Sequence, residues 1–242
     1  MNARNAPVGR SLMLVNAAHP VPASALPERL ERVRGVNGDI PLERTAARAL
    51  RGLVSAVGGD GLVLAVSGFR SRGEQEAIWD EAVAENGVAF ARSYVARPGC
   101  SEHETGLAVD VTLATEPYDF IRPSFPDEGI GREFRRSAAR FGFIERYRAG
   151  EEPVTGIAAE PWHFRYVGAH APVIEQLDLP LEAYVARLRR GTSAERPLRA
   201  CGLLIWWQPE GEPMPRTPFP LIGASVTNEG GIVLVGCDGH GA

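Results

Sequence analysis

Two histidines of this 242-residue chain, His103 and His163, stand beside carboxylates in otherwise apolar stretches. Asp110 follows His103 in the run SEHETGLAVDV. Zinc accepts imidazole and carboxylate ligands, and a catalytic zinc site uses three protein ligands with a fourth position open. His103, Asp110 and His163 supply that set, although their spacing alone also suits histidines that are hydrogen-bonded to carboxylates without a metal.

Glu160 is a candidate general base for the same centre. It lies three residues before His163 and directly before Pro161, which favours an extended backbone and can turn the carboxylate toward the centre. A glutamate beside a zinc-activated water is suited to accept its proton. These residues together indicate metal-assisted hydrolysis.

Strands must hold the candidate ligands in place. Apolar and other side chains alternate over residues 107–113, LAVDVTL, so we expect a strand whose Asp110 points away from the packed face. Residues 160–168, EPWHFRYVG, alternate in the same way and carry His163. The apolar run at 62–69, LVLAVSGF, predicts a buried strand that ends next to Arg70.

Helices are expected around these strands. Ser71 followed by Glu74 is a capping-box pattern, which predicts a helix that ends at the Asn86-Gly87 pair. Pro41 is expected in the first turn of another helix, because Pro suits that position. The apolar spacing predicts helices over 41–57, 131–141, 171–177 and 180–191, and a short strand over 142–147.

The composition changes after Thr192. Three β-like runs follow, separated by Pro, Gly and Glu, without a helical pattern. We therefore expect an α+β protein with a domain at 1–192 and a small β-rich appendage at 193–242.

The overall composition excludes several classes of protein. Hydrophobic residues make up 44% and charged residues 23% of the chain, which is typical of a globular protein. The net charge of −4 gives no electrostatic reason to expect nucleic acid as a partner. No stretch has the length of a transmembrane helix or a signal-peptide core. We therefore expect a cytoplasmic protein if the chain is complete, and an envelope-facing one if a leader has been removed.

Three separate motifs resemble one family. SGFRSRGEQ, SEHETGLAVDV and EPWHFRYVG are similar to the signature blocks of VanY-type D-alanyl-D-alanine carboxypeptidases, within the superfamily that includes the hedgehog signalling domain. The opening LMLVNAAHPVP also resembles the first strand of that family. The resemblance covers residues 12–190. It implies a small antiparallel sheet flanked by helices, with zinc on the open face of the sheet.

The resemblance also implies a role for each matching residue. His103, Asp110 and His163 would bind Zn²⁺, and Glu160 would activate water. Arg70 would hold the substrate carboxylate or the developing oxyanion, since a guanidinium grips a carboxylate through two parallel hydrogen bonds. The residues that match substrate-contacting positions are Gln75, Ser101 and Tyr147. One departure is Phe69, where the family usually has tyrosine.

The expected reaction is removal of the terminal D-Ala from peptidoglycan stem peptides. A D-Ala-D-Ala dipeptidase, an L,D-carboxypeptidase, an endopeptidase and a non-catalytic zinc-stabilised binding domain are the alternatives. We expect the loop at 114–130 to set the preferred peptide length. The oligomeric state is not predicted.

Some other residues favour structural interpretations. Cys100 forms a CxxH pair with His103, but the three ligands already fill the protein's positions around a catalytic zinc. Arg165 is expected in a structural ion pair. The Trp206-Trp207 pair suits packing better than glycan stacking. A bridge between Cys201 and Cys237 has no support from spacing.

Overall fold

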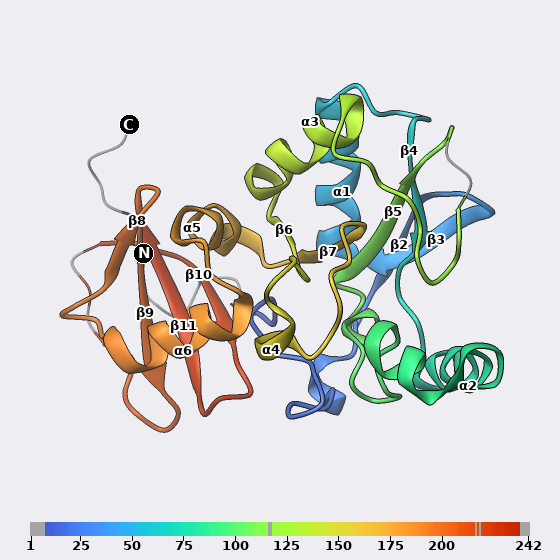
Figure 1. The fold of residues 1–242 in the computed structure, drawn as a ribbon. Coiled ribbons are helices and arrows are strands. Elements are labelled where there is room, and N and C mark those ends of the chain that lie inside the picture. Colours follow the sequence, from blue (N-terminus) through green and yellow to red (C-terminus); the bar gives the residue numbers. More distant parts are fainter. Residues whose placement is uncertain (1–7, 116–117, 216, 218, 238–242) are drawn as a thin grey trace. The chain divides into compact units, whose positions relative to one another are not determined.

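The computed structural model describes residues 8–115, 118–215, 217 and 219–237. Contacts between the described residues divide the chain into two compact units (Figure 1). One is made of residues 15–175, and the other of the described residues from 176 onward together with those before residue 15. The boundary therefore lies before Gln176 and not after Thr192 as expected. The physical reason is that helix α6, Leu181–Gly191, packs against strand β9, Leu203–Pro209.

The unit of residues 15–175 is built on a six-stranded sheet in the order β3-β2-β4-β5-β7-β6. All neighbouring pairs in the sheet are antiparallel except β2 and β4, which are parallel. The α+β class with a largely antiparallel sheet is thus confirmed. The strands are β2 Leu30–Gly35, β3 Gly38–Glu43, β4 Val63–Ser67, β5 Ala108–Leu113, β6 Phe143–Glu145 and β7 His163–Tyr166.

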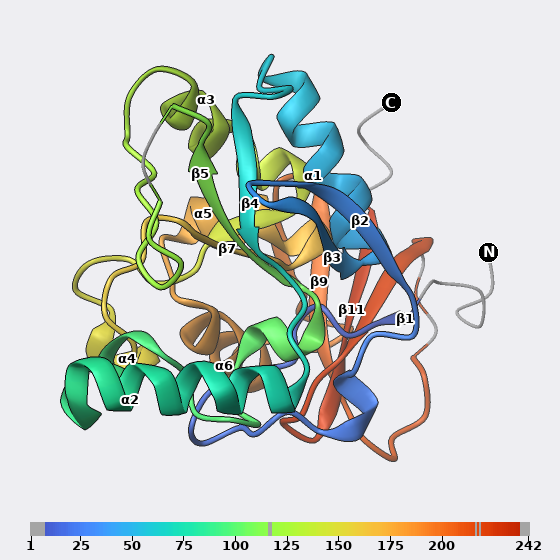
Figure 2. The ribbon, with the colours of Figure 1, turned by 90° about the vertical axis from the view of Figure 1, so that its right-hand side faces the viewer.

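Helices cover one face of this sheet. Helix α1, Arg44–Ala56, begins at Glu43, whose side chain accepts hydrogen bonds from the backbone N–H groups of Thr45 and Ala46. Figure 2 shows α1 beside β2 and β4, and α2 at a distance from it. The core joins α1, α3 (Gly129–Ala138) and the sheet through buried apolar side chains, including Leu50, Leu53, Val63, Val109, Val111, Phe134 and Phe164.

The strand pattern of β5 separates its two faces as predicted. Val109 and Val111 are buried in the core that includes α1. Asp110 and Thr112 point to the opposite face because successive side chains alternate in a strand. Asp110 is nevertheless buried, with 6% of its surface exposed. The polar face of β5 is therefore covered by other parts of the chain.

Helix α2, Arg72–Tyr94, starts with the predicted capping box between Ser71 and Glu74. It continues past its predicted end. Gly87 has a φ of 83°, which breaks the helical geometry, and the chain then resumes helical turns to Tyr94. Gly87 therefore marks a kink and not the end of the helical segment.

Two other predictions for residues 12–43 were wrong. Pro41 lies in β3, an edge strand of the sheet, and not in the first turn of α1. Residues 12–15 belong to no strand, and the β-pairing of Asn16 with His19 is an isolated bridge. The β2–β3 hairpin was not predicted.

Helices α4 and α5 are short. The bounds are Glu152–Thr155 for α4 and Ala171–Leu177 for α5. The described part of the chain contains no helix that is both long and apolar enough to cross a membrane.

The second unit is built on a five-stranded sheet in the order β1-β10-β11-β9-β8. Its β-rich character agrees with the expectation for the end of the chain. Trp206 is fully buried and packs edge-on against Phe219, with ring centroids 5.6 Å apart. The other strands are β1 Val8–Gly9, β8 Leu198–Ala200, β10 Leu221–Val226 and β11 Gly231–Cys237.

Candidate metal centre

Strand pairing brings Asp110 and His163 together across 53 residues of sequence. In the antiparallel register of β5 and β7, Asp110 lies directly opposite His163. Side chains of directly opposed residues share one face of the sheet and lie within contact distance. As a result, the His163 Nδ1 atom is 3.0 Å from the Asp110 Oδ1 atom.

His103 reaches the same place from a 3₁₀ turn, Glu102–Thr105, directly before β5. Its Nδ1 atom lies 2.7 Å from the carbonyl oxygen of Gly68, which is suited to accept an N–H hydrogen bond. Its Nε2 atom then faces Asp110, 3.2 Å from the Oδ2 atom. All three side chains are almost fully buried.

The three side chains fit a zinc ion. One ligand atom from each lies within 4.8 Å of the other two. The His103 Nε2 and His163 Nδ1 atoms approach different oxygens of Asp110, at 3.2 Å and 3.0 Å. The cluster is therefore compact enough for a zinc ion, which needs about 2.0–2.1 Å to each nitrogen or oxygen ligand. Burial would raise the pKa of Asp110, but His103 and His163 outweigh burial and hold that pKa well below its usual range. An ionised Asp110 is suited to bind a cation.

Glu160 lies at the edge of this centre. Its backbone N–H donates to the carbonyl of Tyr147, and its own carbonyl accepts from His163 N–H, which fixes the segment before β7. Its Oε2 atom is 3.5 Å from His163 Nδ1. Burial raises the pKa of Glu160 to about 8. A carboxylate with a pKa near neutrality is well matched to accepting and returning a proton.

Arg70 and Gln75 have unused hydrogen-bonding capacity at the same pocket. The Nε atom of Arg70 and the Oε1 atom of Gln75 are buried and have no hydrogen-bond partner among the described residues. The Nε2 atom of Gln75 donates to the carbonyl of Ala96, which fixes the amide. A buried donor or acceptor without a partner is costly, so both atoms are suited to a polar ligand.

All eight predicted site residues line one pocket: Arg70, Gln75, Ser101, His103, Asp110, Tyr147, Glu160 and His163. The ring of Tyr147 lies against His163, with centroids 4.8 Å apart. Phe120 and Ile121, from the loop at 114–130, form part of the wall. Residues 116–117 of that loop lie outside the described residues.

The structure agrees with the structural interpretations of Cys100 and of the Trp206-Trp207 pair. Cys100 is not among the three grouped ligands, and all three cysteines are free thiols. Trp206 and Trp207 are 0% and 5% exposed, which leaves no surface platform for a glycan.

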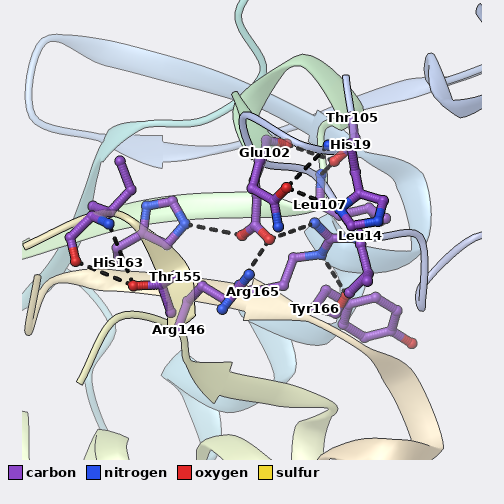
Figure 3. A network of polar contacts seen from close by, with 12 residues as sticks. Leu14, His19, Glu102, Thr105, Leu107, Arg146, Thr155, His163, Arg165 and Tyr166 are labelled. Atoms are coloured by element: carbon purple, nitrogen blue, oxygen red, sulfur yellow. Dashed lines mark hydrogen bonds and ion pairs between the residues drawn. The ribbon is translucent and has the colours of Figure 1, made fainter. Parts of the chain in front are cut away.

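A buried charge network beside the ligands was not predicted from the sequence. Glu102 contacts Arg146, Arg165 and His163 inside the protein (Figure 3). Burial would raise the pKa of Glu102, but Arg146 and Arg165 outweigh burial and hold it far below its usual range. The expected structural ion pair of Arg165 is thus confirmed, and its partner is Glu102.

The site residues lie within a segment that matches a known family. A family model described as VanY, D-alanyl-D-alanine carboxypeptidase, matches residues 39–169, more than half of the chain. The chain belongs to the VanY family. This confirms the resemblance seen in the three motifs, and the matched segment contains all eight predicted residues.

Relatives of this VanY-family chain share most of its length. The bifunctional D-Ala-D-Ala dipeptidase and D-Ala-D-Ala carboxypeptidase VanXYC of Enterococcus gallinarum is 39% identical over 176 residues, which cover 72% of this chain and 93% of that protein. A D-alanyl-D-alanine carboxypeptidase of Enterococcus faecalis is 36% identical and covers 72% of this chain and 65% of its own length.

Two solved structures of the family share its fold. The vancomycin resistance D,D-dipeptidase VanXYg, in complex with a D-Ala-D-Ala phosphinate analogue, has a TM-score of 0.84 at 33% identity and covers 95% of this chain and 94% of its own. The second is a mutant of the D,D-pentapeptidase VanY from a VanB-type resistance cassette, in complex with Zn(II). It has a TM-score of 0.60 at 35% identity, and the match covers 72% of this chain and 98% of that chain.

Proposed function

We propose that this chain is a zinc-dependent D-alanyl-D-alanine carboxypeptidase that removes the terminal D-Ala from peptidoglycan stem peptides. The observation that carries the proposal is the convergence of three metal ligands, a general base and a buried arginine in one pocket. The same ligand set without Glu160 and Arg70 would suit a binding domain. Their presence favours catalysis.

His103, Asp110 and His163 hold the zinc ion. When bound, zinc supplies a Lewis acid that polarises the scissile carbonyl and makes water a better nucleophile at neutral pH. The unit of residues 15–175, which contains the whole ligand set, is the catalytic unit.

The chain's own residues perform the proton transfers. Glu160 accepts a proton from the attacking water as the water oxygen bonds to the carbonyl carbon. It returns the proton to the leaving nitrogen as the C–N bond breaks. The products are the shortened peptide, with a new carboxylate, and free D-alanine. One water is consumed, and Glu160 ends in its starting state.

Arg70 supplies the recognition that an exopeptidase needs. Its guanidinium binds the terminal carboxylate and places the last peptide bond next to Glu160. Gln75, Ser101 and Tyr147 contact the terminal residues, and the Gln75 Oε1 atom is suited to accept from a substrate N–H group. The loop at 114–130 limits peptide length through Phe120 and Ile121.

A dipeptidase activity on free D-Ala-D-Ala is the second candidate. It is favoured by the match to the D,D-dipeptidase VanXYg, which covers 95% of this chain, whereas the VanY structure covers 72%. The bifunctional relative VanXYC supports both activities in one protein.

A mass-spectrometric time course of the zinc-loaded protein distinguishes these activities. The substrates are a muropeptide pentapeptide, the corresponding tetrapeptide and free D-Ala-D-Ala. We expect one D-Ala to be lost from the pentapeptide, and cleavage of the free dipeptide as well would add the second activity. Cleavage of the tetrapeptide or the dipeptide alone would overturn the carboxypeptidase assignment, and no cleavage of any substrate would favour an endopeptidase or a binding domain.

A further inference from the structure

Glu102 is buried among positive charges directly behind a metal ligand. Its side chain is 0% exposed, and so is that of Arg146. Its Oε1 atom lies 2.8 Å from Arg146 Nε and 3.1 Å from Arg165 Nη1. Its Oε2 atom is 3.3 Å from His163 Nε2. Figure 3 shows the carboxylate between His163 on one side and the two guanidinium groups on the other.

The two nitrogens of the His163 ring therefore face different groups. Nδ1 faces the ligand cluster, 3.0 Å from Asp110 Oδ1, whereas Nε2 faces Glu102. An ionised carboxylate only accepts hydrogen bonds, so the Nε2 atom carries a proton that it donates to Glu102. The Nδ1 lone pair is then left for the metal.

We propose that Glu102 is a positioning residue for zinc, which holds the His163 ring so that Nδ1 binds the metal. The proposal rests on the proposed zinc site. Ligating histidines commonly donate their second N–H to a carboxylate, which fixes the ring orientation. Arg146 and Arg165 hold that carboxylate in place, because each pairs with the Oε1 atom and leaves Oε2 to His163.

The arrangement has a reason beyond fold stability. Burial of an ion pair brings little or no net stability compared with apolar packing, because both ions lose their hydration. A cluster of one carboxylate and two guanidiniums, all buried, is therefore poorly explained by stability alone. Rigid alignment of a metal ligand gives the cluster a function.

The test replaces Glu102 by Gln, which keeps the size of the side chain and removes its charge. Zinc affinity is measured by competition with a chelator of known affinity, and folding by circular dichroism. We expect zinc affinity to fall by about 10–100-fold, the usual effect of losing a partner of a metal ligand.

Glu104→Gln is the matched control. Glu104 lies in the same 3₁₀ turn and is 1% exposed, but it accepts from Gly99 N–H and pairs with Arg72. We expect its zinc affinity to equal that of the unmodified protein. An equal loss in both variants would overturn the proposal, since it would reflect damage to the turn. A folded Glu102→Gln variant with unchanged zinc affinity would also overturn it.

A second measurement covers the case in which Glu102→Gln does not fold. Nitrogen-15 NMR of the His163 ring in the unmodified, zinc-loaded protein should show metal at Nδ1 and a slowly exchanging proton on Nε2. Metal at Nε2, or an Nε2 proton that exchanges as in free solvent, would overturn the proposal. Neither experiment uses peptide hydrolysis, so failure of the proposed peptidase activity would be seen separately.

Discussion

The candidate metal centre depends on single atoms whose neighbours fix their direction. The Nδ1 atom of His103 is engaged by the Gly68 carbonyl, which leaves Nε2 for the metal. The Nε2 atom of His163 is engaged by Glu102, which leaves Nδ1. Asp110 contacts both rings, through Oδ2 to His103 and through Oδ1 to His163. The residue types were predictable from the sequence, but the choice of ring nitrogen required the structure.

Replacing Asp110 by Ala should abolish tight zinc binding. Loss of a direct ligand should weaken affinity by more than about 100-fold, because even losing a partner of a ligand costs about 10–100-fold. Chelator competition measures the change. Thr112→Ala is the control, since Thr112 lies on the same face of β5 and bonds to the Ser124 carbonyl, away from the ligands. Equal zinc binding by Asp110→Ala and the control would argue against the assigned ligand set.

The role of Glu102 could not be predicted from local sequence patterns. Its partner Arg146 is 44 residues away in the sequence. The motif around Glu102 pointed to the adjacent His103 as the candidate metal ligand. A charged residue in a loop is usually solvated, and burial of this one becomes evident only from the fold. The expectation that Arg165 forms an ion pair came closest to revealing the network.

Among the elements, the strands that carry the site were the most predictable. The alternation of side chains over 107–113 predicted both the strand and the direction of Asp110. Successive side chains of a strand point to opposite faces, so Asp110 lies on the face opposite the apolar core. The register that places Asp110 opposite His163 was not predictable, since pairing joins segments far apart in sequence. The β2–β3 hairpin was missed because Pro41 suggested a helix start. An edge strand accepts proline, since an edge backbone N–H need not be bonded.

Gly106 connects the turn that carries His103 to the strand that carries Asp110. Its φ is +68°, and a Cβ atom would lie 2.9 Å from the backbone nitrogen of Glu43. Gly106→Ala should therefore destabilise the protein by about 2–4 kcal/mol, from left-handed strain and the close contact together. Urea denaturation measures the free energy of unfolding.

Gly73→Ala serves as the comparison for Gly106→Ala. Gly73 lies in α2, and a Cβ atom there would meet nothing within 4 Å. Its stability should be unchanged or higher by up to about 1 kcal/mol. If both variants had the stability of the unmodified protein, the backbone at Gly106 would not be required in this conformation.

At the scale of the whole molecule, the chain forms two units, and all predicted site residues belong to one of them. The sequence indicated a change of character after Thr192, but the boundary lies before Gln176 because α6 packs against β9. The composition shows where helical patterns end and strand patterns begin. It does not show which helix packs against which sheet. We therefore expect zinc binding to stabilise the unit of residues 15–175.

Removal of zinc should lower the melting temperature of the unit that contains the site. A ligand present at about 1,000 times its dissociation constant adds about 4 kcal/mol of stability. For a unit of this size that corresponds to roughly 8–16 °C. Calorimetry with and without a chelator measures the shift, and Asp110→Ala should show none. If the chelator did not change the melting temperature of the unmodified protein, this result would contradict a zinc site.

The most direct test of the central claim is the release of D-Ala from a pentapeptide by the zinc-loaded protein and by its Glu160→Gln variant at matched zinc content. Glu160 contacts the centre without being a ligand, so the variant should keep its zinc and lose turnover by about 100- to 10,000-fold. Zinc bound in full with turnover almost abolished would establish Glu160 as the proton carrier of a zinc carboxypeptidase. Unchanged turnover in the variant, or no D-Ala release by the unmodified protein, would contradict the account.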